Sequence, residues 1–217
     1  MGKVIDLFRE GEGNMDTAYA KTVEADSPKI NPETLDEDVE KLLNEYDLDS
    51  CLPIDPVELA KRFGIEVYKA EFETLKNDTI SGLIRVKDND ITIYVNKADS
   101  ILRQRFTIAH ELGHYFMHIN KIKNKGINID MHRKTGYTSL IPDEIDANKF
   151  AAALLMPKKI VNEYYKKVNY IGMDKEFIVD WLSIQFKVSK QAMIFRMKNL
   201  GIGKQKSCMM KAHNLNN

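Results

Sequence analysis

The sequence predicts an α+β protein, and three features of its 217 residues carry that prediction. Residues 55–64 have the signals of a short amphipathic helix. Three strand-like runs follow, and a longer helical stretch containing the letters HELGH comes next. Because helices and strands fall into separate groups here, we expect an α+β domain with a small antiparallel sheet.

Two helices are predicted before the strands. Asn31-Pro32 is typical of a helix start, since proline suits the first helical position. The apolar face of this helix comprises Leu35, Val39, Leu42 and Tyr46. In the second helix, Asp55 is a suitable N-cap, Glu58 can reach back as in a capping box, and Gly64 ends the helix.

The strand-like runs are IEVYKA at 65–70, ISGLIRV at 80–86 and ITIYV at 91–95. The polar letters KDND between the last two predict a hairpin. Because ITIYV directly precedes the HELGH helix, we expect it to form the sheet edge, where an extended substrate segment could pair as an added strand. The alternative is an interior strand without a free edge.

The stretch FTIAHELGHYFMH at 106–118 places titratable side chains inside an apolar run. Residues four apart lie on one face of a helix, so His110 and His114 can aim their imidazoles at one metal ion. Glu111 is then placed to act as general base on a water beside the metal, as in H-E-x-x-H zinc peptidases. Gly113 suits a close approach by another backbone.

A third ligand is predicted on a helix that Pro142 opens and Pro157 closes. On that helix Glu144 and Asn148 fall on one stripe with small residues. Glu144 can supply an oxygen ligand, which leaves a fourth position for water. Asn148 can hydrogen-bond a ligand imidazole and fix its orientation.

Four further residues are candidates for other roles at the site. His118 lies too far along the helix axis to join His110 and His114, so a place lining the cleft is expected. His132, in the loop between the two motif helices, and Tyr137 are candidates to stabilise an oxyanion, as is the neighbouring Arg133. A plain polar loop is at least as good an interpretation for His132, Tyr137 and Arg133.

Composition limits the class of protein. No apolar run approaches the roughly 20 residues that span a bilayer, and the N-terminus lacks an apolar signal region. The only cysteines are Cys51 and Cys208, so a reducing, cytoplasmic location is expected. Residues 1–50 carry 5 basic and 14 acidic residues, and we interpret 1–28 as a flexible acidic arm.

The C-terminal segment, 161–217, reads as two short helices with a tight turn and a basic tail. Such a pair resembles a helix-turn-helix, which would present Lys190, Gln191 and Arg196 to DNA. Packing on the catalytic domain, or gripping a substrate protein, is the favoured alternative.

These motifs together resemble the ImmA/IrrE family of metallopeptidases. The resemblance rests on RQRFTIAHELGHYFMH at 103–118, DEIDANKFAAALLMP at 143–157 and SGLIRVKDNDITIYVN at 81–96. It covers roughly residues 53–160. In the downstream motif, Asp146 replaces the family's usual second glutamate, which matters only if that acid, rather than Glu144, is the ligand.

The resemblance implies a zincin-like peptidase domain, for which we predict the bounds 29–160. It further implies a cytoplasmic Zn²⁺-dependent endopeptidase that cleaves a helix-turn-helix repressor and so derepresses mobile-element or stress genes. The alternative is a DNA-binding regulator whose zinc site is structural or vestigial. The expected partner is a protein substrate; DNA is a less favoured partner, and no membrane partner is expected.

Overall fold

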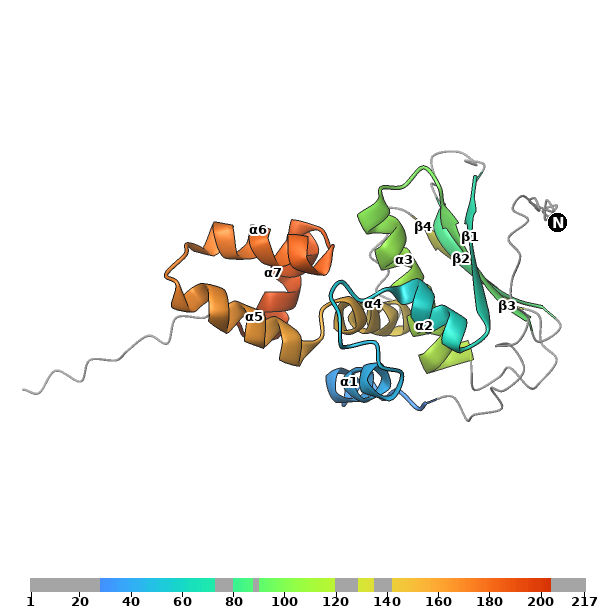
Figure 1. Cartoon of the computed structure of the whole chain (residues 1–217). Helices are drawn as coiled ribbons and strands as arrows, with labels where there is room; N and C mark the ends of the chain where they lie inside the picture. Colours follow the sequence, from blue (N-terminus) through green and yellow to red (C-terminus); the bar gives the residue numbers. More distant parts are fainter. Residues whose placement is uncertain (1–27, 73–79, 88–89, 120–128, 135–141, 204–217) are drawn as a thin grey trace, which may run out of the picture.

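The computed structural model describes residues 28–72, 80–87, 90–119, 129–134 and 142–203, and its fold is α+β as predicted (Figure 1). The strands are β1 (Ile65–Ala70), β2 (Ile80–Lys87), β3 (Asp90–Asn96) and β4 (Ile129–Lys134). The helices are α1 (Leu35–Glu45), α2 (Pro56–Arg62), α3 (Ile101–His114), the π-helix η1 (Tyr115–Ile119), α4 (Pro142–Leu155), α5 (Lys158–Tyr170), α6 (Lys175–Phe186) and α7 (Lys190–Asn199).

The sheet differs from the predicted one in two respects. Its strand order is β1-β3-β2-β4, and β2 and β3 form the predicted antiparallel hairpin. However, β1 pairs with β3 in parallel, from Ile65 opposite Ile91 to Ala70 opposite Asn96, so the sheet is mixed. This pairing covers the second side of β3, and the prediction that ITIYV forms an edge is therefore wrong. The described edge strands are β1 and β4.

The local signals for helix starts are mostly confirmed. The Asp55 side chain caps α2 by accepting a hydrogen bond from Val57 N at 3.0 Å, and Ser100 caps α3. Glu58 does not reach back but pairs with Lys61 at 2.9 Å. The first helix begins at Leu35, later than predicted, because Pro32 lies in a turn that precedes it.

Helix α3 lies against the sheet, and α4 packs against α3 on the other side, between the sheet and the three C-terminal helices (Figure 1). The core is continuous from Ile84 and Ile93 of the sheet, through Leu112 of α3 and Leu154 of α4, to Leu182 of α6. The HELGH stretch of α3 is therefore packed between the sheet and α4.

The C-terminal helices are fastened to the rest of the chain by buried polar contacts. Arg196 of α7 is only 5% exposed; it donates to Met156 O at 2.9 Å and pairs with Asp36 of α1 at 2.5 Å. The interpretation that Arg196 faces DNA is therefore wrong, because its guanidinium is used inside the protein. Lys190 is exposed, and its ammonium pairs with Asp180 at 2.6 Å.

The structure also bears on the predicted domain boundary, the two terminal segments and the absence of membrane spans. Helix α5 runs across the predicted boundary at residue 160. The predicted acidic arm lies outside the described residues except for residue 28, and so does the basic tail beyond residue 203. Among the helices described, none has both the length and the apolar character needed to cross a bilayer.

Candidate metal centre

Helices α3 and α4 approach each other closely at Gly113. A Cβ atom at this position would lie 2.9 Å from Ala147 Cα, 3.0 Å from Ala147 O and 3.2 Å from Phe150 Cβ. Only a glycine therefore lets the two backbones lie this near, as its place in the motif suggested. The approach sets the first turn of α4 opposite the last turns of α3.

Three side chains converge across this contact. His114 Nε2 lies 3.0 Å from Glu144 Oε1, and His110 Nε2 lies 3.3 Å from Glu144 Oε2. The two Nε2 atoms are 3.0 Å apart. Both imidazoles are buried, whereas the Glu144 side chain is 20% exposed and opens the site to solvent. Within the described part of the chain, these residues form the group of potential metal ligands that the geometry brings together.

The spacing of these donors fits a small divalent ion. In a tetrahedral zinc site with bonds of about 2.0–2.1 Å, neighbouring ligand atoms lie about 3.3 Å apart. The nitrogen–nitrogen and nitrogen–oxygen distances of 3.0–3.3 Å are close to this value. Two imidazoles and one carboxylate also form the donor set of many catalytic zinc sites, which keep a fourth position open.

Asn148 orients one of the two imidazoles. Its Oδ1 atom lies 3.1 Å from His110 Nδ1 and can accept a hydrogen bond from that nitrogen, which turns His110 Nε2 toward His114 and Glu144. Hydrogen bonds with His110 and then with His114 hold the pKa of the Glu144 carboxyl well below its usual range. Glu144 is thus an anionic donor at neutral pH.

Glu111 lies on a different face of α3 from the two histidines. Its side chain is 1% exposed, and its Oε1 atom would be 3.3 Å from a Cβ atom on Gly82 of β2. The carboxylate therefore lies against strand β2 of the sheet. Sequence reasoning did not single out Gly82, although a glycine inside a strand is a known sign of close approach by another group.

His118 stands at the edge of the cluster. It follows α3 in the π-helix η1, and its ring centroid lies 5.8 Å from that of His114. Its Nδ1 is 3.7 Å from Asp143 Oδ1, and its side chain is 25% exposed. His118 is not in the group of three potential ligands, as its place farther along the helix axis suggested, and its role in lining a cleft stays a prediction.

The remaining candidates are only partly described. The backbone of His132 lies in strand β4, opposite Leu83 of β2, and not in a loop as predicted. Arg133 follows it in the same strand, opposite Gly82. Tyr137 lies outside the described residues. Strand β4 was missed because the alternation of apolar and polar residues in IDMHRK covers only its first four letters and is followed by two charged residues.

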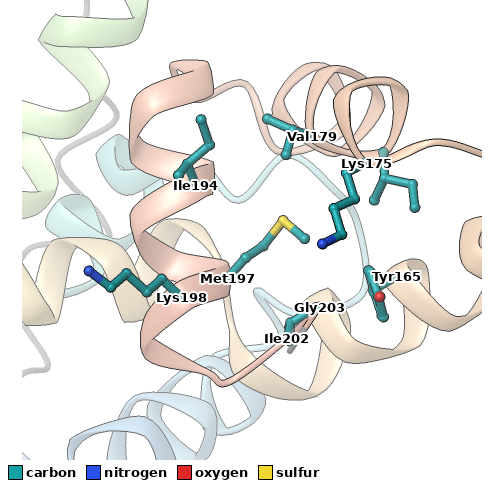
Figure 2. Close-up of a pocket in the computed structure, with 9 residues that line it drawn as sticks. Tyr165, Lys175, Val179, Ile194, Met197, Lys198, Ile202 and Gly203 are labelled. Carbon is teal, nitrogen blue, oxygen red and sulfur yellow. The ribbon is translucent and has the colours of Figure 1, made fainter. Parts of the chain in front are cut away.

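Away from these residues, a hollow of about 230 Å³ lies between α5, α6 and α7 (Figure 2). Its walls are mainly apolar, and Lys175 extends toward Met197 and Tyr165, whereas Lys198 points away from them. The lining includes no histidine, cysteine or carboxylate, so this hollow has none of the usual ligands of a metal ion.

Comparison with known proteins agrees with the geometry. The sequence pattern of the IrrE N-terminal-like domain, a peptidase family, matches residues 60–198. The chain is also similar to Metallopeptidase ImmA of Bacillus subtilis (strain 168), with 28% identity over 114 residues. This alignment covers 51% of the present chain and 62% of the relative, so the chain spans less than two thirds of that protein's length.

Proposed function

Because the chain belongs to the ImmA/IrrE family of peptidases, we propose that it is a zinc-dependent endopeptidase of the zincin-like class. The proposal rests on the convergence of His110, His114 and Glu144 at 3.0–3.3 Å and on the buried carboxylate of Glu111, the residue that follows His110 in α3. A structural zinc site would be closed by four protein ligands. Here the described ligand group has three members.

His110, His114 and Glu144 would hold the ion, and Asn148 would orient the His110 ring. A zinc ion in this site supplies Lewis acidity toward the scissile carbonyl and lowers the pKa of a water molecule. Glu111 takes a proton from the attacking water and then delivers it to the leaving nitrogen. Its burial keeps the carboxylate away from competing solvent, and its place on α3 fixes it beside the ligands.

We propose a cytoplasmic helix-turn-helix repressor as the substrate. The support is the family membership and the similarity to Metallopeptidase ImmA. Cleavage of such a repressor would derepress the mobile-element or stress genes that it silences. A helix-turn-helix repressor is therefore the class of substrate to test first.

Glu111→Gln separates metal binding from catalysis. The variant should hold about one zinc ion per chain, because the ligands are unchanged, and should lose repressor cleavage. Incubation of purified, zinc-loaded protein with the repressor, followed by electrophoresis, measures cleavage. Cleavage by Glu111→Gln at the parent rate would show that Glu111 is not the base.

A DNA-binding regulator is the second candidate. The tight turn between α6 and α7, with Lys187 in the left-handed region at φ 48° and Ser189 as N-cap, favours it. The burial of Arg196 removes one of its three expected DNA contacts. A gel-shift titration at several salt concentrations separates the candidates: sequence-preferring binding that survives His110→Ala would favour the regulator.

A further inference from the structure

One face of α3 contacts two consecutive residues of strand β2, Ser81 and Gly82. Arg103, Thr107 and Glu111 are spaced four residues apart, so they lie on one face of the helix. The Arg103 side chain donates to Ser81 Oγ, from Nη2 at 2.8 Å and from Nε at 3.1 Å. A Cβ atom on the next residue, Gly82, would meet both Thr107 and Glu111.

In a regular strand, Ser81 and Gly82 would face opposite sides of the sheet. Here both face α3, and the register between β2 and β4 shifts between Ile80 and Gly82, so Ser81 is the extra residue of a β-bulge. Such bulges re-aim side chains and recur next to active sites. Because of this bulge, Arg103 of α3 can hydrogen-bond Ser81, and the absence of a side chain at Gly82 leaves space between β2 and α3.

The room above Gly82 is occupied by Thr107 and Glu111. A Cβ atom there would overlap Thr107 Cγ2 and would lie 3.3 Å from Glu111 Oε1, so both side chains adjoin the same point. Thr107 is fully buried, and among the residues that the structure describes its Oγ1 has no hydrogen-bond partner. A buried hydroxyl without a partner is costly and calls for a specific reason.

We propose that Gly82 and Thr107 are positioning residues for Glu111. Gly82 leaves the space against strand β2 in which the Glu111 carboxylate lies. The Thr107 hydroxyl donates a hydrogen bond to that carboxylate in the active protein. This inference rests on the proposed function, in which Glu111 is the base. Thr107 would act through Glu111 and would contact neither the metal ion nor the substrate.

Two substitutions at Thr107 isolate the hydroxyl group. Thr107→Val keeps the side chain's shape and removes the donor, whereas Thr107→Ser keeps the donor and removes Cγ2. A hydrogen bond to a charged group contributes about 1.5–3 kcal/mol, so Thr107→Val should lower kcat about 10- to 100-fold. KM and the zinc content should not change, and Thr107→Ser should retain kcat within a few-fold.

Thermal unfolding provides a readout that does not depend on activity. A merely structural role for the hydroxyl would lower the unfolding temperature of Thr107→Val and leave the kcat of the folded protein unchanged. The proposal expects kcat to fall at an assay temperature at which circular dichroism shows Thr107→Val to be fully folded. Gly82→Ala should lower kcat as well, since its added methyl group presses on Glu111, and combination with Thr107→Ser should restore its unfolding temperature by removing Cγ2.

The results separate this inference from the proposed function. If zinc is bound and Glu111→Gln is inactive, but Thr107→Val cleaves the repressor at the parent kcat, then the positioning role is refuted and the peptidase assignment stands. If Thr107→Ser is as impaired as Thr107→Val, the hydroxyl is again not the cause. If the parent protein binds no zinc or does not cleave, the proposed function itself fails.

Discussion

Replacing Gly113 with alanine tests the close contact that brings the metal ligands together. The new Cβ atom would lie 2.9 Å and 3.0 Å from Ala147 Cα and O, which are backbone atoms and cannot rotate away. Overpacking of this kind costs about 1–3 kcal/mol, and the backbone contacts place this case near the upper end. The gain in helix propensity offsets about 1 kcal/mol. The expected net loss of stability is therefore about 1–2 kcal/mol.

Thermal unfolding of the metal-free protein measures this loss. For a chain of this size, 1 kcal/mol corresponds to about 2–4 °C, so the unfolding temperature of Gly113→Ala should fall by about 2–8 °C. Lys166→Ala, at an exposed position of α5, is the control and should change stability by less than about 0.5 kcal/mol. An unfolding temperature of Gly113→Ala at or above that of the parent would refute the close packing of α3 and α4.

Two other substitutions test contacts around this core. Asn148→Ala removes the hydrogen-bond partner of His110 Nδ1, and it should weaken zinc binding about 10- to 100-fold, measured by competition with a chromophoric chelator; unchanged affinity would contradict the orienting role. Arg196→Ala leaves Asp36 without its partner in a half-buried position, and it should lower the free energy of unfolding in urea by about 2–4 kcal/mol. Adding Asp36→Asn should recover part of that loss, and no recovery would count against the ion pair as its cause.

Much of the candidate site could be predicted because its determinants are local. The spacing of His110 and His114 on one helix fixes their common face, whatever the rest of the fold does. Glu144 and Asn148 likewise share a face of α4, and the cap residue Asp55 acts within one turn of its helix. The contact of α3 with α4 was also foreseeable, because Gly113 is a residue that favours close approach.

What could not be predicted depends on partners that are distant in the sequence. No pattern within 65–70 or 91–95 shows that these strands pair in parallel, so ITIYV was wrongly expected at an edge. Arg196 was a candidate DNA contact in the less favoured interpretation of the C-terminal helices, and the partner that buries it, Asp36, lies 160 positions earlier. In both cases a tertiary contact outweighs the local pattern.

Gly82 is an intermediate case. Its place inside a strand hinted at a close approach, but the neighbours that require the glycine, Thr107 and Glu111, become evident only when α3 is packed on β2. The bulge at Ser81 was equally invisible, since it arises from the register between β2 and β4. The residues that would bind the metal could therefore be predicted from the sequence, whereas the strand residues that pack against α3 could not.

Metal analysis of the purified chain tests the central assertion that His110, His114 and Glu144 bind a single ion. Elemental analysis after dialysis should find about one zinc per chain in the parent and a marked loss in His110→Ala and in Glu144→Ala, each of which removes one of three protein ligands. Circular dichroism should show that the variants remain folded. A parent without bound zinc, or a folded Glu144→Ala variant with the affinity of the parent, would contradict the account.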